Sequence, residues 1–200
     1  MKGYLFLNGD PPAKMPATDD GITVCADGAY EYVSRHIRPD AVLGDFDSLN
    51  LSEVPAGIKT VRFPSHKDYT DGHLAVEYMS KARCSSIEIY GAFGGRPDHE
   101  LCNYSLLAYA HELGMKAVIK GDSFDVLLID GEFTGTARKD ATVSLVPFDS
   151  RIHILYTKGL KYAAKALTVD RIHIISVSNG AVGGEFSVSV NGLTLLFVER

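Results

Sequence analysis

Short apolar runs alternate with longer segments of helical spacing over about the first 120 residues of the chain. Two segments carry apolar side chains at helical intervals, one over residues 74–82 and a more apolar one over residues 101–109. Such an alternation is typical of an α/β domain with a mostly parallel sheet. The runs that predict its strands are residues 4–7, 21–25, 41–43, 59–63, 86–90 and 116–119.

The pattern changes from about Phe124 onward, where strand-like runs recur with turn signals between them. Asn191-Gly192, between the last two runs, predicts a tight hairpin. We therefore expect an N-terminal α/β domain at residues 1–123 and a C-terminal all-β, sandwich-like domain at residues 124–200. The runs that predict strands in the second domain are residues 126–129, 141–146, 152–156, 171–177, 186–190 and 193–198.

Composition narrows the class of protein. The 200 residues carry a net charge of −5, which argues against a general nucleic-acid binder, because phosphate contacts need a basic face. No apolar run approaches the roughly 20 residues that span a bilayer. The three cysteines form no Cys-x-x-Cys pair and are expected to be small buried residues in a reducing compartment. These features favour a cytoplasmic protein that binds neither membrane nor nucleic acid.

The stretch Gly44-Asp45-Phe46-Asp47-Ser48 places two carboxylates two residues apart. If this stretch is extended, Asp45 and Asp47 point to the same face. Two hard oxygen donors at a strand end suit a Mg²⁺ ion that holds phosphate oxygens. In isolation, the same motif more often belongs to a solvated loop than to a metal site.

Further acidic residues follow predicted strands or begin predicted helices. Asp27 follows an apolar strand, while Thr70 and Asp71 stand where the first long helix should start and suit its N-cap. Asp98 begins the second helix. Each acid alone fits a cap or turn, but five acids at equivalent edges of one sheet repel one another, and a divalent cation relieves that repulsion.

The stretch from Gly91 to His99 is the candidate phosphate site. Its closely spaced glycines let backbone N–H groups approach an anion, and the helix after Pro97 adds partial positive charge. Arg96 can hold a phosphate through two hydrogen bonds. The chain contains neither a Walker A motif nor a Gly-x-Gly-x-x-Gly fingerprint, so a nucleotide would bind by a different arrangement.

These motifs, in this order, resemble those of the thiamine pyrophosphokinase family. The resemblance rests on Ala26-Asp27-Gly28, the Gly44 to Ser48 stretch, Lys67-Asp68-Tyr69-Thr70-Asp71, and the Gly91 to His99 stretch with Asn103. It continues through Gly159-Leu160-Lys161-Tyr162 and Ser178-Asn179, and so covers nearly the whole chain. It implies an α/β catalytic domain, a thiamine-binding β-sandwich, and a homodimer with active sites at the subunit interface.

The implied reaction moves the pyrophosphoryl group of ATP onto the hydroxyl of thiamine, giving thiamine diphosphate and AMP with Mg²⁺ as cofactor. By resemblance, Arg96, Asp98 and Asp71 are catalytic, and the metal ligands are Asp45, Asp47 and Asp71 with Asp27 nearby. Two positions depart from the family pattern: Tyr69 stands where Lys is frequent and His73 where Glu is frequent. The residues implied to bind nucleotide or thiamine are Lys67, Asp68, Thr70, Gly94, Gly95, Arg96, His99, Asn103, Ser178 and Asn179.

Two other functions are compatible with the residues. A metal-dependent phosphoesterase also uses clustered Asp residues with a neighbouring His, and His99 is placed for that role. A catalytically inactive sensor of thiamine or nucleotide is the second, although binding alone does not require so many candidate metal ligands.

Overall fold

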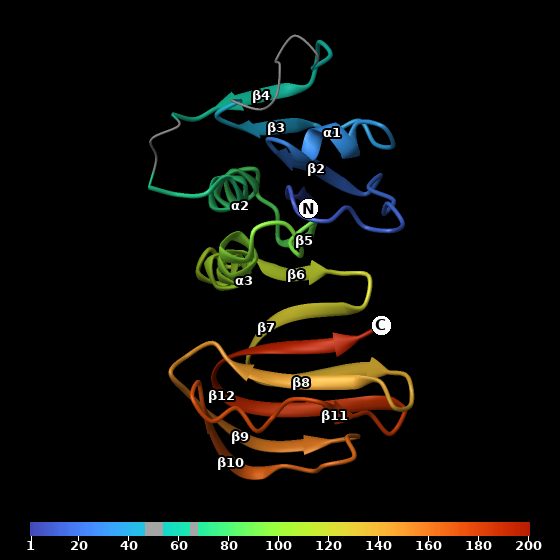
Figure 1. Cartoon of the computed structure of the whole chain (residues 1–200), viewed down its shortest axis with the longest axis vertical. Helices are drawn as coiled ribbons and strands as arrows, with labels where there is room; N and C mark the ends of the chain where they lie inside the picture. The colour runs from blue at the N-terminus through green and yellow to red at the C-terminus, as the bar shows by residue number, and fades with distance from the viewer. Residues whose placement is uncertain (47–53, 65–67) are drawn as a thin grey trace. The chain divides into compact units, whose positions relative to one another are not determined.

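The computed structural model of the chain describes residues 1–46, 54–64 and 68–200, which form two compact units, Met1–Gly121 and Asp122–Arg200 (Figure 1). The first unit is an α/β domain and the second is all-β, so the expected fold class is confirmed. Within the described residues, no helix combines the length and the apolar character that a membrane span needs.

The first unit is built on a parallel sheet in the strand order β6-β5-β1-β2-β3-β4. All six strands predicted from the apolar runs form. The elements of this unit are β1 (Lys2–Phe6), β2 (Gly21–Ala26), α1 (Ala29–Val33), β3 (Ala41–Gly44), β4 (Lys59–Arg62), α2 (Asp71–Lys81), β5 (Ser86–Tyr90), α3 (Pro97–Glu112) and β6 (Lys116–Lys120).

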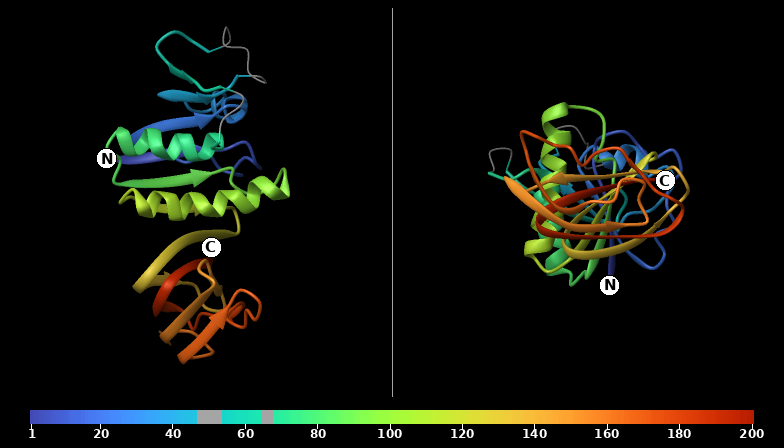
Figure 2. Two further views of the ribbon diagram at one scale, coloured as in Figure 1. Left: turned by 90° about the vertical axis from the view of Figure 1, so that its left-hand side faces the viewer. Right: turned by 90° about the horizontal axis from the view of Figure 1, so that it is seen from below.

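Both faces of this sheet are covered. Alternate residues of β1 point to opposite faces, and Tyr4 and Phe6 join Tyr30 and Val33 of α1 in one buried cluster. On the other face, α2 packs against β1, β2 and β3, and α3 packs against α2 and β6. The left view of Figure 2 shows α2 and α3 side by side across that face. Burial on both faces explains why these strands are nearly continuous apolar runs.

Both long helices begin where the sequence predicts. Thr70 is the N-cap of α2, and its side chain accepts a hydrogen bond from the backbone N–H of His73. Pro97 occupies the first turn of α3, where its missing N–H costs nothing. Asp71 and Asp98 therefore lie in first helical turns, near the positive ends of the helix dipoles.

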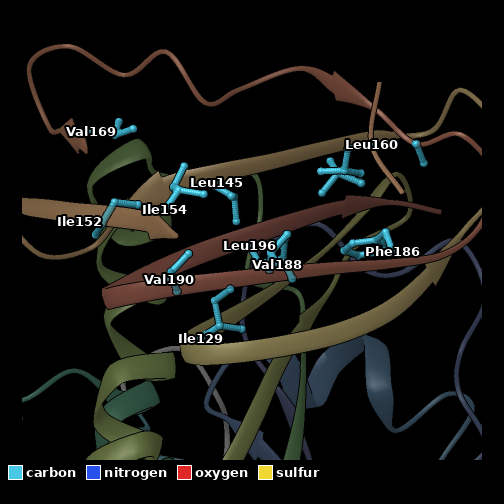
Figure 3. Close-up of a cluster of buried hydrophobic side chains, with 12 residues drawn as sticks. Ile129, Leu145, Ile152, Ile154, Leu160, Val169, Phe186, Val188, Val190 and Leu196 are labelled. Carbon is cyan, nitrogen blue, oxygen red and sulfur yellow. The ribbon is translucent and has the colours of Figure 1, made fainter. Parts of the chain in front are cut away.

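The second unit is an antiparallel sandwich organised around its last strand. β12 pairs with β7 along most of its length, with β9 through its first half and with β8 through its second half. Side chains from both halves fill one core that includes Phe186, Val188 and Leu196 (Figure 3). The strands are β7 (Phe124–Ala137), β8 (Thr142–Pro147), β9 (Arg151–Lys158), β10 (Lys165–Asp170), β11 (Asn179–Gly180) and β12 (Gly184–Glu199).

The hairpin predicted at Asn191-Gly192 is wrong, because β12 runs through this dipeptide as one strand with a bulge. Gly192 takes a φ of 105°, a conformation that favours glycine. The Asn191-Gly192 dipeptide therefore forms a bulge within the strand and does not reverse the chain direction. The backbone N–H of Leu193 donates to Asp149 Oδ2 at 2.8 Å, and that of Gly192 donates to Asp130 Oδ1 at 3.2 Å. At the bulge, acidic side chains thus accept the hydrogen bonds that a neighbouring strand would otherwise accept.

The strand predicted over residues 171–177 does not form either. Asp170 Oδ1 accepts hydrogen bonds from the backbone N–H groups of Ile172 and His173, at 2.9 and 2.8 Å, and this turn ends β10. The apolar side chains that follow are largely exposed, with Ile172 at 86% and Ile175 at 67%. The apolar pattern of this segment therefore marks an exposed surface and not a core strand.

The bulge in β12 generates a prediction about Asp149. The variant Asp149→Ala leaves the part-buried N–H of Leu193 without its acceptor, which costs about 1–2 kcal/mol locally. Hydrogen exchange at the Leu193 amide is expected to become at least ~10-fold faster. Asp130→Ala is the matched control, because it removes the neighbouring acceptor of Gly192 and should leave Leu193 protected. Unchanged exchange at Leu193 in Asp149→Ala would contradict this account of the bulge.

Candidate active site at the carboxyl edge of the parallel sheet

The order of the parallel strands creates a crevice beside β1. From β1 the chain moves through β2 and β3 to β4 on one side, then returns to β5 on the other side. Loops that leave the carboxyl ends of strands at such a reversal diverge, and ligands bind between them. A cleft of about 710 Å³ opens there, lined by Leu7, Asn8, Gly9, Ala26, Asp27, Gly28, Asp45, Asp68, Tyr69, Thr70, Asp71, Gly72, Gly94, Gly95, Arg96, His99, Cys102 and Asn103.

Four carboxylates among the described residues line this cleft: Asp27, Asp45, Asp68 and Asp71. They come from the ends of β2 and β3 and from the start of α2, as expected from the sequence. Carboxylate oxygens are the donors that Mg²⁺ prefers, so the chemistry of this set fits that ion. No three His, Cys, Asp or Glu side chains in the described part of the chain form a ready metal-binding group, and Asp47 lies outside the described residues.

Gly44 matters because Asp27 lies directly over it. A Cβ atom at Gly44 would come within 2.7 Å of the Asp27 Cβ, closer than two side chains can approach. The backbone N–H of Asp27 donates to the carbonyl of Leu43 at 2.7 Å, which fixes the turn after β2 against β3. Gly44 therefore allows the turn that carries Asp27 to pack closely against β3.

The expectation of an extended stretch after Gly44 is wrong at Phe46. Phe46 has a φ of 58°, in the left-handed region, and its side chain is buried in the cluster with Tyr4 and Phe6. The chain turns here because the phenyl ring enters the core on the α1 face of the sheet. The alternation of a strand, which places side chains i and i+2 on one face, therefore does not continue across Phe46.

Side chains of α3 hold the glycine loop that precedes it, residues 91–95, through hydrogen bonds. The N–H of Gly94 donates to Glu100 Oε2 at 2.9 Å, and Asn103 Nδ2 donates to the carbonyl of Ala92 at 2.8 Å. Gly94 has a φ of 75°, and a Cβ there would meet the Asp10 carboxylate. Asn103 lines the cleft, and its observed contact is with the loop itself.

Arg96 and Asp98 form a two-bond ion pair at the start of α3. Arg96 Nε donates to Asp98 Oδ1 at 3.1 Å, and its terminal nitrogen donates to Oδ2 at 2.6 Å. The two side chains are 71% and 63% exposed. The Arg96 guanidinium lowers the pKa of Asp98 to about 2, chiefly through these hydrogen bonds. Arg96 lines the cleft, and Asp98 is linked to it through Arg96.

The N-terminal turn of α2 carries a second polar cluster. Thr70 Oγ1 lies 2.8 Å from His73 Nδ1, and His73 Nε2 lies 3.3 Å from Ser105 Oγ on α3. Burial lowers the pKa of His73. Tyr69, on the other side of Thr70 from Asp71, lines the cleft with its ring near that of His73.

Some residues that line the cleft were not predicted from the sequence. Asn8 and Gly9 follow β1 directly and line the cleft, and their position after an apolar strand was the available signal. Cys102 also lines the cleft and is exposed, so the expectation of a buried residue is wrong for it, whereas Cys25 and Cys84 are buried. Cys102 lies in the N-terminal half of α3, one turn before the buried Leu106.

The remaining predicted residues fall elsewhere. Lys67 lies outside the described residues. Ser178 and Asn179 belong to the second unit, where Asn179 lines a cavity of about 330 Å³ with mostly aliphatic walls. The side chain of Asn179 accepts from the N–H of Tyr162 at 3.0 Å and donates to its carbonyl at 2.7 Å. Asn179 thereby holds the backbone of Tyr162, whose ring is 74% exposed.

Comparison with known proteins covers both units. Residues 17–119 match the family model for the thiamin pyrophosphokinase catalytic domain, and residues 132–194 match the thiamin pyrophosphokinase vitamin B1 binding domain. The chain is 27% identical to the thiamine pyrophosphokinase of Bacillus subtilis (strain 168) over 179 residues, 84% of this chain and 83% of that one. It is 24% identical to thiamin pyrophosphokinase 1 of Caenorhabditis elegans over 197 residues, 88% of this chain and 79% of that one.

Solved structures show the same fold. The crystal structure of the thiamine pyrophosphokinase from Bacillus subtilis superposes with a TM-score of 0.86 at 20% identity, over 99% of each chain. The yeast thiamin pyrophosphokinase superposes with a TM-score of 0.80 at 17% identity, over 99% of this chain and 86% of that one.

The Arg96–Asp98 pair generates a prediction that NMR can measure. The Asp98 carboxyl should titrate near pH 2 and rise toward the ordinary value of 3.8 in Arg96→Gln, because the hydrogen bonds to the guanidinium stabilise the charged form. The carboxylate is therefore ionised throughout the neutral range, and its ion pair weakens only as pH falls through about 2. Lys81→Gln, which removes a similar exposed pair with Glu77, is the control. An Asp98 pKa unaffected by Arg96→Gln would refute the pairing in solution.

Proposed function

The chain belongs to the thiamin pyrophosphokinase family, a family of thiamine pyrophosphorylating enzymes, and on that basis we propose that its reaction is Mg²⁺-dependent transfer from ATP in the cleft beside β1. The products are thiamine diphosphate and AMP. The hydroxyl oxygen of thiamine attacks the β-phosphorus of ATP, the bond from that phosphorus to the α–β bridging oxygen breaks, and AMP leaves with that oxygen. The hydroxyl proton passes to solvent or to a nearby base.

One observation carries the location of this site. The cleft brings four carboxylates together with Arg96 and the N-terminal ends of α2 and α3. Positive helix ends and a guanidinium attract phosphate oxygens, whereas four carboxylates repel them unless a cation intervenes. This mixture suits a metal–phosphate complex better than either an anion or a cation alone.

Asp27, Asp45 and Asp71 are the proposed metal ligands, together with Asp47. Bound Mg²⁺ supplies charge neutralisation and alignment of phosphate oxygens, the main requirements of this reaction class. Asp71 lies in the first turn of α2, and Gly44 allows the Asp27 turn to approach β3 and Asp45.

Arg96 and the glycine loop are the proposed phosphate contacts. Gly94, Gly95, Arg96 and His99 line the cleft at the start of α3, and Glu100 and Asn103 hold that loop in place. Asp98 is a weak base because its pKa is about 2, so its proposed task is to accept a hydrogen bond from the thiamine hydroxyl and orient it. Catalysis then depends on positioning more than on strong proton abstraction.

The second unit is the proposed thiamine-binding domain. Its match to the vitamin B1 binding model supports this role, as does the cavity that Asn179 lines. The chain lacks Trp, so an exposed Tyr such as Tyr162 is the available ring for stacking on thiamine. We extend the proposal to a cytoplasmic location, which the three free thiols support.

A homodimer is the proposed assembly, with residues 172–177 of the second unit at its interface. Four aliphatic side chains of this segment are exposed, namely Ile172, Ile174, Ile175 and Val177. A contiguous apolar stretch on a protein surface is typical of a contact with another chain. The backbone N–H of Leu145 donates to the carbonyl of Ser176 at 2.8 Å, which holds this segment against β8, so a second copy can bury it without refolding.

Product analysis tests the reaction. Purified protein is mixed with ATP, Mg²⁺ and thiamine, and the products are separated by chromatography. Equal amounts of thiamine diphosphate and AMP are expected. Thiamine monophosphate with ADP would overturn transfer of the pyrophosphoryl group, and phosphate release without a thiamine product would indicate a phosphoesterase.

Substitution of the acidic residues tests the site. Asp45→Asn should lower turnover at least ~100-fold, because the amide removes the charge that holds the metal–phosphate complex. Asp47→Asn and Asp71→Asn should act in the same way, with the melting temperature preserved. Asp19→Asn, at an exposed position outside the cleft, is the matched control. Normal turnover in Asp45→Asn would rule out the cleft as the active site.

The dimer has a separate test. The native protein should have about twice the chain mass of 21.7 kDa by light scattering. Ile172→Glu places a charge at the proposed interface, where its desolvation is costly, so a shift to the monomer is expected. Leu155→Glu alters another exposed aliphatic residue, outside this segment, and serves as the control. A dimer that persists in Ile172→Glu would refute this interface.

A further inference from the structure

His73 is a residue to which neither the family motifs nor the proposed mechanism gives a task. It lies in the first turn of α2, two residues after Asp71, and its ring is half-buried between α2 and α3. Its centroid lies 6.2 Å from that of Tyr69 and 5.6 Å from that of Tyr109. Two aromatic neighbours thus limit the orientations available to the imidazole.

The hydrogen bonds around His73 define one direction of donation. Ser105 Oγ lies 2.6 Å from the carbonyl oxygen of Cys102, which only accepts, so the single hydroxyl proton of Ser105 is used there. Ser105 Oγ must then accept from His73 Nε2, at 3.3 Å. In a neutral imidazole, Nδ1 consequently has no proton and accepts from the Thr70 hydroxyl, at 2.8 Å.

These hydrogen bonds use the single proton of the Thr70 hydroxyl. Its proton points to His73, and one lone pair of Oγ1 already accepts from the backbone N–H of His73 as the helix cap. Thr70 therefore has no proton left to donate to a phosphate in the cleft. The hydroxyl expected from the sequence to bind nucleotide instead belongs to a link between two helices.

We propose that His73 is a positioning residue that ties the N-terminal turn of α2, which carries Asp71, to α3 through Thr70 and Ser105. The proposal rests on the proposed function of the cleft, because Asp71 and Arg96 face that cleft from the two linked helices. α3 begins directly after Arg96, so the link fixes the start of α2 against the helix that follows the phosphate loop. An alignment-dependent reaction is sensitive to displacements of about 1 Å between such groups.

NMR of the native protein tests the direction of the hydrogen bonds. At about pH 8 an imidazole of ordinary pKa is neutral, and ¹⁵N shifts report which ring nitrogen holds the proton. The proton is expected on Nε2 of His73. A proton on Nδ1 would overturn the proposed chain, because Ser105 would then have no donor and Thr70 would be released.

Kinetics test the consequence. His73→Phe keeps the aromatic packing and removes both side-chain bonds, while Ser105→Ala removes only the α3 end of the link. Each is expected to lower kcat/KM for ATP by about 10-fold through a higher KM for ATP, with KM for thiamine unchanged. Because one break opens the link, the double variant should be no worse than the poorer single variant. A loss of stability alone would lower the active fraction and leave both KM values unchanged.

Two comparisons keep the outcomes distinct. His111→Phe, an exposed histidine in the last turn of α3, should behave as the native protein. If Asp45→Asn is inactive while His73→Phe and Ser105→Ala match the native protein, the positioning role fails and the cleft remains the active site. If Asp45→Asn is fully active, the proposed function of the cleft fails first. Independent, multiplicative losses in the double variant would also refute the link.

Discussion

Parallel pairing on both sides of β1 is the constraint on which the first unit depends. β1 holds β2 on one side and β5 on the other, and the chain reverses its direction of travel across the sheet at this strand. The carboxyl ends of β1, β2 and β3 consequently face one crevice, together with the first turns of α2 and α3. Side chains more than 90 residues apart in sequence are thereby brought to one place by backbone pairing, before any of them contacts a ligand.

Glycines in both chemical motifs make room for acidic side chains. Gly44 accepts the close approach of Asp27, and Gly94 accepts that of Asp10, and in each case a Cβ would collide with the neighbouring carboxylate-bearing side chain. These two glycines therefore provide space for acidic side chains and not only flexibility for their loops. The two motifs are related by this shared function and not by similar backbone geometry.

Much of the first unit could be predicted because its signals are local. The helix starts at Thr70 and Pro97 follow from capping chemistry, and the strands follow from apolar runs buried on both faces. Other features depend on contacts distant in sequence. The Asn191-Gly192 signal was overridden by pairing with β7 and by the Asp149 carboxylate, and the link from His73 to Ser105 requires the packing of two helices. Asn8 directly follows a strand that the sequence does predict, so its place at a strand end was an available signal.

The positions of the acidic residues could be predicted because the ends of strands can be predicted from the sequence. The side chains with which these residues pair could not be predicted. The pairing of Arg96 with Asp98 turns a candidate base into an ionised, weakly basic carboxylate. Nothing in the spacing of the two residues distinguishes an Arg that waits for phosphate from an Arg already paired with its neighbour. Residue type and position predict a site of this kind, whereas roles within it depend on side-chain conformation.

The use of β12 by both halves of the second unit has a consequence for how that unit comes apart. Its first half holds β9 and its second half holds β8, while β7 spans both. Neither half can lose its central strand without exposing the core that the other half shares. We therefore expect the sandwich to unfold as one cooperative block, with no half-sandwich intermediate stable enough to accumulate.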